Sequence, residues 1–288
     1  MKNFTSNNFK ILTGTAMFLL GFIFDANLKV KANTCVENPN TFPSSCLKTP
    51  VIYKTRIYEL GLCTDDPLSG TIGSGNNITS DYAIDLSTCV KTFEAENGSL
   101  VDLSTIGTPQ VLVGQDIKPP VGRYPYAYVK LSNTFVLKGS QLVNNIPFYS
   151  SSDGTATKVL SEYTEWDNKV IDFEKGIECE PLANNRKMAS VDNYSSGDVV
   201  GTVKAVLSHI NNGNFVATTP EQCGTSSRVF GSFKPTNPVI ISDSTKGLEV
   251  SFSIKNKGLA VVPWSGNDDS EVGYFSTGPF LPSFTTLE

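Results

Sequence analysis

Hydrophobic and polar residues alternate one by one along many stretches of the chain, and the longest of these stretches runs from Pro119 to Gly139. A period of two predicts a β-strand with one face in a core and the other toward solvent. We therefore predict one long strand here, with the remainder of an all-β fold organised around it. The apolar face is Ala127, Val129, Leu131, Phe135 and Leu137, and the polar face is Tyr126, Tyr128, Lys130, Ser132, Thr134 and Lys138.

Further strand signals, each bounded by turn-forming residues, recur along the rest of the sequence. This rhythm predicts an antiparallel β-sandwich. In the segment Val51–Cys63 the apolar set changes face near Gly61, which predicts a β-bulge. The other predicted strands are Tyr82–Leu86, Leu100–Leu103, Gln110–Val113, Ile146–Tyr149, Val199–Leu207, Arg228–Phe233, Val239–Ile241 and Leu248–Ile254.

The region from about 140 to 223 has weaker signals and reads as an irregular insertion. Within it, Lys158–Val170 places apolar residues at near-helical spacing, which predicts a short helix packed on the sandwich. No shift in composition marks a linker, so residues 33–288 are predicted to form a single elaborated sandwich domain. The spaced apolar residues are Leu160, Tyr163, Trp166 and Val170.

The first 32 residues have the pattern of an export signal. Lys2 and Lys10 precede a fourteen-residue apolar stretch, Ile11–Phe24, and a small residue, Ala32, ends the segment. A membrane span needs about 20 apolar residues, so a cleaved signal peptide is favoured and an uncleaved anchor is the alternative. Cleavage removes four lysines and one aspartate and changes the formal net charge from −5 to −8. Such an acidic protein is a poor fit for nucleic acid or anionic membranes.

An even number of cysteines behind an export signal predicts a disulfide-braced protein. None of them forms a Cys-x-x-Cys pair, which argues against zinc and thioredoxin-like chemistry. Proximity in the sequence predicts the pairs 35–46, 63–89 and 179–223. The six residues are Cys35, Cys46, Cys63, Cys89, Cys179 and Cys223.

Few residues combine into a pattern that predicts catalysis. His209 is the only histidine, and no Gly-x-Ser-x-Gly motif accompanies it, so it is expected to be a surface residue at a strand end. Paired carboxylates such as Asp167, Asp172 and Glu174 would suffice for glycoside hydrolysis, but their spacing is unremarkable. The loop Asn267–Glu271 is rich in oxygen ligands and reads as a plain turn. We predict a protein with no catalytic residue, metal or cofactor.

Three tyrosines, Tyr124, Tyr126 and Tyr128, lie at or near the polar face of the long predicted strand. Exposed together, their rings would offer a platform for sugar rings or another ligand. The alternative is that they pack beneath the 140–223 region. These residues are the candidate ligand-binding site.

Three stretches together resemble uncharacterised exported β-sandwich proteins of marine bacteria, and more distantly the prealbumin-like sandwich domains of secreted lipoproteins. The stretches are Tyr53–Cys63, the turn from Pro120 that continues into the strand through Phe135, and Leu248–Ile254 with the Pro- and Phe-rich ending that follows. The resemblance implies an exported sandwich fold and identifies no catalytic residue.

These observations predict a non-enzymatic structural protein that is secreted or held at the cell surface, such as a filament subunit or an adhesin. Its expected partners are further copies of itself or other surface proteins, with no nucleic acid and no membrane after signal cleavage. Segments 33–50 and 273–288 are the candidates for crossing between subunits. The alternative is an exported module that binds glycans or another ligand, and the third hypothesis is a carboxylate-dependent hydrolase.

Overall fold

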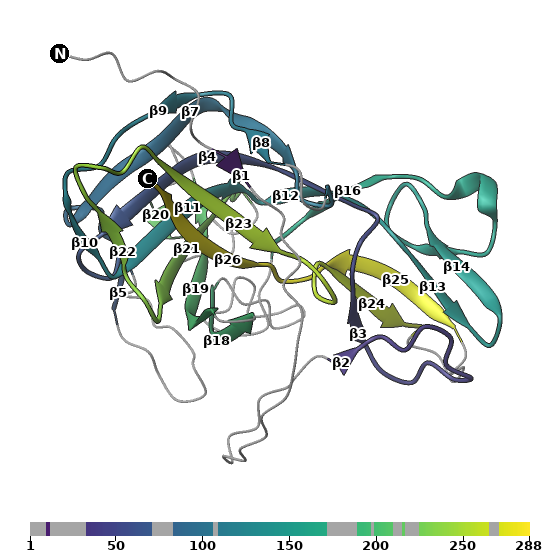
Figure 1. The fold of residues 1–288 in the computed structure, drawn as a ribbon. Coiled ribbons are helices and arrows are strands. Elements are labelled where there is room, and N and C mark those ends of the chain that lie inside the picture. Colours follow the sequence, from purple (N-terminus) through teal and green to yellow (C-terminus); the bar gives the residue numbers. More distant parts are fainter. Residues whose placement is uncertain are drawn as a thin grey trace, which may run out of the picture.

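The computed structural model describes residues 10–11, 33–70, 83–105, 109–171, 189–196, 199–209, 215–216, 225–264 and 271–288. In this part of the chain nearly all regular structure is β-strand, and the exception is a 3₁₀ turn, η2 (Leu160–Glu162). The strands form several antiparallel sheets in a sandwich-like arrangement (Figure 1). The predicted all-β, disulfide-braced class is confirmed.

The largest sheet has ten strands and is centred on β4 (Ile52–Cys63). One edge of β4 pairs along its length with β7 (Cys89–Asp102), with a register shift at Leu60/Gly61 that confirms the predicted bulge. On the other edge, the first residues of β4 pair with β12 (Thr134–Lys138) and the later ones pair with β11 (Tyr126–Ser132). The remaining strands are β9 (Gln115–Asp116), β16 (Trp166–Lys169), β18 (Ala189–Ser196), β19 (Val199–His209), β20 (Phe215–Val216) and β21 (Arg228–Pro235).

The long strand predicted from Pro119 to Gly139 is divided into three, so its predicted continuity is wrong. Pro125 separates β10 (Gly122–Tyr124) from β11, and β10 pairs with β22 (Val239–Ile241) in a different sheet. Proline has no N–H to donate to a ladder, which makes it a natural point for the chain to change sheets. The predicted apolar face is confirmed, because its positions in β11 and β12 are all buried. The prediction that the opposite face meets solvent is wrong for β11, where Tyr128 and Lys130 are buried as well.

The second break, at Asn133, lets β11 and β12 have different outer neighbours. β11 pairs there with β21, whereas β12 pairs with β16. The buried Asn133 side-chain amide donates to the carbonyl oxygens of Val170 (3.0 Å) and Ser226 (2.9 Å), residues that adjoin these two neighbours. The hydrogen bonds satisfy backbone groups where the two ladders diverge.

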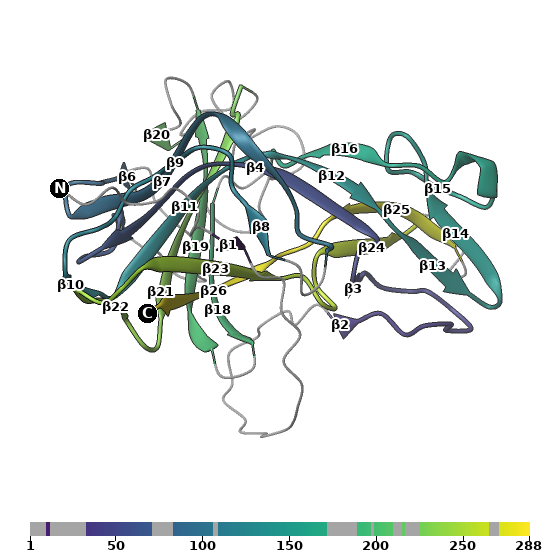
Figure 2. The same cartoon turned by 45° about the horizontal axis from the view of Figure 1, so that its top comes forward.

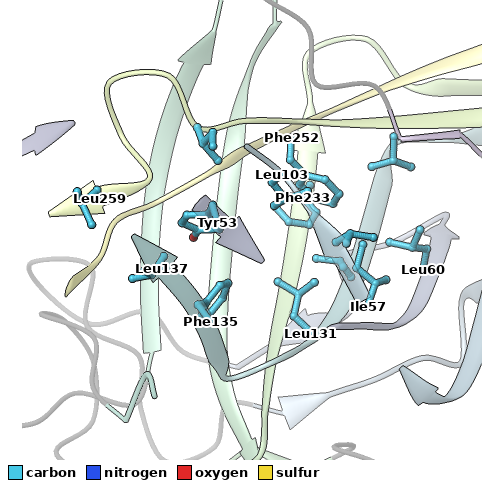
Figure 3. Close-up of a cluster of buried hydrophobic side chains, with 14 of the residues drawn as sticks. Tyr53, Ile57, Leu60, Leu103, Leu131, Phe135, Leu137, Phe233, Phe252 and Leu259 are labelled. Atoms are coloured by element: carbon cyan, nitrogen blue, oxygen red, sulfur yellow. The ribbon is translucent and has the colours of Figure 1, made fainter. Parts of the chain in front are cut away.

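A smaller sheet covers the ten-stranded one in the order β26, β23, β1, β8. Its strands are β26 (Leu281–Leu287), β23 (Gly247–Ser253), β1 (Lys10–Ile11) and β8 (Gln110–Val111). Phe252 of β23 and Phe233 of β21 both point into the core between the layers (Figure 3). Tyr53 completes this core, with its ring centroid 6.4 Å from that of Phe280 and its hydroxyl donating to the carbonyl of Gly278 at 3.1 Å.

Shorter sheets form the other end of the molecule, to the right in Figure 1. β2 (Asn33–Thr34), β3 (Cys46–Lys48), β24 (Leu259–Pro263) and β25 (Val272–Thr277) form one of them. β13 (Ser140–Val143), β14 (Ile146–Ser150) and β15 (Ala156–Thr157) form another. A two-stranded ladder, β5 (Leu68–Ser69) with β6 (Ala83–Ile84), lies beyond the end of β4.

The helix predicted over Lys158–Val170 is absent, and this prediction is wrong. Only η2 is helical there, and Leu160 within it is 67% exposed rather than packed. Trp166 instead begins β16, which pairs with the free edge of β12 and buries the indole ring. The region 140–223 also supplies β18 and β19 to the ten-stranded sheet, so in its described residues it is part of the architecture.

Candidate functional site

The three tyrosines proposed as a ligand platform differ in how far their side chains are exposed to solvent. Tyr124 is 5% exposed and its hydroxyl donates to the carbonyl of Pro120 at 2.9 Å. Tyr128 is 1% exposed, whereas Tyr126 is half-buried with the Lys234 ammonium 5.2 Å from its ring centroid. Two of the three rings are therefore unavailable to a ligand, and the tyrosines do not form an exposed aromatic platform.

Tyr128 belongs to a second, smaller hydrophobic core on the outer side of β11. Its ring stacks on Phe230 of β21 with 5.3 Å between centroids, and Val206 and Leu207 of β19 belong to the same cluster. Leu68 completes the cluster from the segment after β4. Burial beneath residues of the 140–223 region was the alternative interpretation of the tyrosines, and for Tyr128 it is confirmed.

A buried ionic cluster lies beside this ring and is centred on Glu59 of β4. One carboxylate oxygen of Glu59 accepts a hydrogen bond from the Tyr128 hydroxyl at 2.5 Å, and the other accepts one from Lys130 Nζ at 3.1 Å. Lys91 Nζ lies 3.5 Å from the second oxygen and 2.8 Å from Glu94. Glu59 is 6% exposed and Lys130 3%, so both charges are removed from water and compensated by each other.

Strand register brings these groups together. Lys130 of β11 is the direct neighbour of Glu59 on β4, and Glu94 of β7 is its neighbour on the other edge. Tyr128 is two residues from Lys130, so its side chain emerges on the same face. The sequence contained a partial signal for this cluster, because Lys130 is the one charged residue of β11 and Glu59 is the one acidic residue of β4. Periodicity did not reveal that the two strands pair.

Gly61 provides the space that Tyr128 needs to reach Glu59. A Cβ atom at Gly61 would lie 2.1 Å from Cε1 of the Tyr128 ring and 2.7 Å from the carbonyl oxygen of Val90. The ring therefore crosses β4 directly over this glycine. Burial, reinforced by the Glu59 carboxylate, raises the pKa of Tyr128 far above the ordinary tyrosine value, so the hydroxyl remains a donor.

A second polar contact fixes the segment that follows β4. Lys204 Nζ of β19 pairs with one carboxylate oxygen of Asp66, and the other oxygen accepts from Ser232 Oγ at 2.9 Å and from the backbone N–H of Leu68 at 3.0 Å. These contacts hold the 64–70 segment over the second core. Both carboxylate oxygens of Asp66 are bound by protein donors, so we assign these contacts a structural role in positioning the segment.

The structure contains two of the three predicted disulfides. Cys35–Cys46 closes the segment that precedes β4, and Cys63–Cys89 joins the end of β4 to the start of β7. The Cα atoms of these pairs are 4.9 and 4.0 Å apart. The third predicted pair, Cys179 with Cys223, lies outside the described residues.

A small hollow with unsatisfied polar atoms lies between β9 and the start of β23. Its volume is about 30 Å³, and its lining includes Thr92, Asp116, Gly247 and Leu248. Thr92 Oγ1 and Asp116 Oδ1 are buried without a hydrogen-bond partner, and burial raises the pKa of Asp116 above its ordinary value. Pockets for drug-sized ligands hold about 300–1,000 Å³, so this hollow suits a single polar group.

The other residues considered for chemistry do not come together in the described part of the chain. Asp167 is an exposed residue of β16, while Asp172 and Glu174 lie outside the described residues. The backbone of His209 ends β19, and its side chain is not described. Of the 267–271 loop only Glu271 is described, where it accepts from Lys158 Nζ at 2.5 Å. Among described residues, no group of three or more histidine, cysteine or acidic side chains is placed to hold a metal.

Both segments suspected of crossing between subunits are paired within their own chain. β26 pairs with β23 from Leu281 to Leu287, and Thr34 and Leu47 adjoin one another in the β2–β3 ladder. β3 in turn pairs with β24. No helix in the described residues is long and apolar enough to span a membrane.

No protein-family model, curated protein or solved structure matches this chain. The described part of the chain contains a buried ionic cluster whose groups are paired with one another, and a small hollow in which Thr92 Oγ1 and Asp116 Oδ1 have no hydrogen-bond partner.

Proposed function

We propose that this chain is a non-enzymatic structural protein, exported to the cell surface or beyond it, that self-associates as a filament subunit or acts as an adhesin. The observation that carries the proposal is the use of its polar groups and cysteines to brace strands. The Glu59 cluster links β7, β4 and β11, and Cys63–Cys89 fastens the end of the same β4–β7 ladder.

Export is supported by the two disulfides, since such bonds form and persist in oxidising compartments. The apolar pattern of residues 1–32 supports it independently. A body with several internal ladders and two covalent braces resists opening under load or proteolysis, because local unfolding requires more of its contacts to break together. This mechanical property is useful to a surface protein.

Self-association is supported by the extent of β-structure in the chain. An exposed sheet edge carries unpaired N–H and C=O groups, which can pair with a strand of another molecule. The terminal strands β2 and β26 already pair with strands of their own chain. Assembly would therefore proceed through an exposed sheet edge rather than through release of the C-terminal strand.

The decisive experiment is electron microscopy of the exported protein, combined with sedimentation velocity over a wide range of protein concentrations. Filaments or discrete oligomers that grow with concentration are expected, and reduction of the disulfides should weaken them. A protein that remains monomeric at the highest attainable concentration would contradict self-assembly. Adhesion would then be tested separately, by binding of the labelled monomer to intact cells.

A further inference from the structure

The Cys63–Cys89 disulfide joins two residues that face each other directly across the β4–β7 ladder. Cys63 is the last residue of β4 and Cys89 the first of β7, and the two are register partners in this antiparallel pair (Figure 2). The Cβ atoms of directly opposed residues are about 4.5–5.5 Å apart, whereas an unstrained disulfide needs about 3.8 Å. The bond therefore has to draw the two strands together, which makes it easier to reduce than a disulfide between residues that are not opposed.

The Cys35–Cys46 disulfide does not have this arrangement. In the parallel β2–β3 ladder the register partner of Cys46 is Asn33, and Cys35 lies two residues further along the chain. No pair of strands has to be drawn together to form this bond. The chain therefore contains a matched comparison between an opposed and an unopposed disulfide.

Reduction also requires that a thiolate reach one of the two sulfur atoms. Cys63 is fully buried in the second core, whereas Cys89 is half-buried, so the attack is expected at Cys89. The thiolate of a small thiol bonds to Cys89 Sγ, the S–S bond breaks, and Cys63 Sγ leaves with the electron pair and takes up a proton. A second thiolate then attacks the sulfur of the first small thiol, which releases Cys89 as a thiol and the small thiol as its own disulfide.

The disulfide closes a cover over the second core. The described parts of this cover are segments 64–70 and 83–88, which pair with each other as the β5–β6 ladder. Leu68 is buried within the second core, and Ile84 and Leu86 pack against it. The cover therefore shields apolar side chains of the ten-stranded sheet from water.

Polar contacts also hold the cover in place. Asp66 pairs with Lys204 and accepts a hydrogen bond from Ser232 at 2.9 Å, and the Thr64 N–H donates to the carbonyl of Thr88 at 3.0 Å. These contacts can break and re-form, whereas an intact disulfide keeps the two ends of the cover together. Loss of the disulfide should therefore increase local opening of the cover without unfolding the sheet.

We propose that Cys63–Cys89 is a redox-sensitive switch, whose reduction by a small thiol loosens the cover and exposes apolar side chains of the second core while Cys35–Cys46 stays oxidised. A reduced Cys63 can remain buried, because a free cysteine packs as a small apolar residue. The other pairs of the β4–β7 ladder do not depend on the bond. The switch is independent of self-association and can be tested on dilute protein.

The first test compares the two disulfides in the oxidised full chain. The protein is equilibrated in glutathione buffers of increasing thiol-to-disulfide ratio, free thiols are blocked with N-ethylmaleimide, and each pair is measured by peptide mass mapping. Cys63–Cys89 should be half reduced at a ratio at least about tenfold lower than Cys35–Cys46. Equal ratios, or earlier reduction of Cys35–Cys46, would overturn the switch.

The second test measures opening of the cover by hydrogen exchange. In protein reduced at Cys63–Cys89, amides of segments 64–70 and 83–88 should exchange at least about tenfold faster than in the oxidised protein, while those of β23 keep their rates. The double variant Cys63→Ala/Cys89→Ala should show the same acceleration without any thiol, and Cys35→Ala/Cys46→Ala should not. Unchanged exchange in the reduced wild-type protein would overturn the switch, and this comparison decides the question if the double variant does not fold.

Discussion

Replacement of Glu59 by glutamine tests whether the buried ionic cluster holds the ten-stranded sheet together. Glutamine preserves the shape of the side chain and removes its charge. Lys130 Nζ, now 3.1 Å from a carboxylate oxygen, would lose its anion in a site where Lys130 is 3% exposed. The Tyr128 hydroxyl would also lose a charged acceptor at 2.5 Å.

The expected cost follows from this burial. Removing one partner of a buried ion pair typically lowers the free energy of unfolding by about 3–5 kcal/mol, because the remaining charge stays buried without compensation. Lys130→Met should cost less, about 1–3 kcal/mol, since Glu59 retains the Tyr128 hydroxyl and Lys91. The double variant should cost less than the sum of the two, by a coupling of about 0.5–3 kcal/mol.

Urea unfolding of the oxidised protein, followed by fluorescence and circular dichroism, measures these free energies. Glu165→Gln is the matched control, because Glu165 pairs with Lys54 at 3.0 Å with both side chains partly exposed, at 38% and 28%. That substitution should cost no more than about 1 kcal/mol. If Glu59→Gln costs as little as the control, or if the two cluster substitutions are additive, the cluster does not brace the sheet.

Three further outcomes follow from the structure. Burial raises the pKa of Tyr53 and Tyr128 above the ordinary value. The contribution of these two neutral side chains to the free energy of unfolding is therefore complete below a pH of about 10, and it is lost as the pH rises further. Phenolate absorbance should show at least two tyrosines that ionise only on unfolding, and one fewer in Tyr128→Phe; full ionisation of the native protein would contradict this. Loss of Cys63–Cys89, which spans 26 residues, should lower the free energy of unfolding by about 3–4 kcal/mol, and peptide mapping that finds free thiols there would refute the pairing. Gly61→Ala should cost about 1–3 kcal/mol through the clash with Tyr128, and the same substitution combined with Tyr128→Ala should cost much less than the two changes added together.

The sequence alone determined the fold class and most of the strands. The alternation in β23 and β12 records which face of each strand is buried, because side chains of a strand point to opposite sides in turn. The bulge near Gly61 was also readable, since one extra residue moves the apolar set to the other face. Two disulfides were predictable from proximity, because both join cysteines that lie close together in the chain.

Only the tertiary structure decided where strands end and what lies beside them. The alternation between Pro119 and Gly139 is continuous in sequence, yet its two halves have different outer neighbours, and the break at Asn133 depends on Val170 and Ser226. Near-helical spacing around Trp166 was overridden by the open edge of β12, which offered unpaired backbone groups.

Burial of Tyr128 likewise depends on the tertiary structure. A period of two places Tyr128 and Lys130 on the face away from the main core, and in a two-layer sandwich that face meets water. Here β11 pairs with β21 and β21 with β19, so Phe230, Val206 and Leu207 gather there into a second core. Periodicity describes one strand and its two faces. What covers the Tyr128 face depends on Val206, Leu207 and Phe230, which are more than seventy positions away in the sequence.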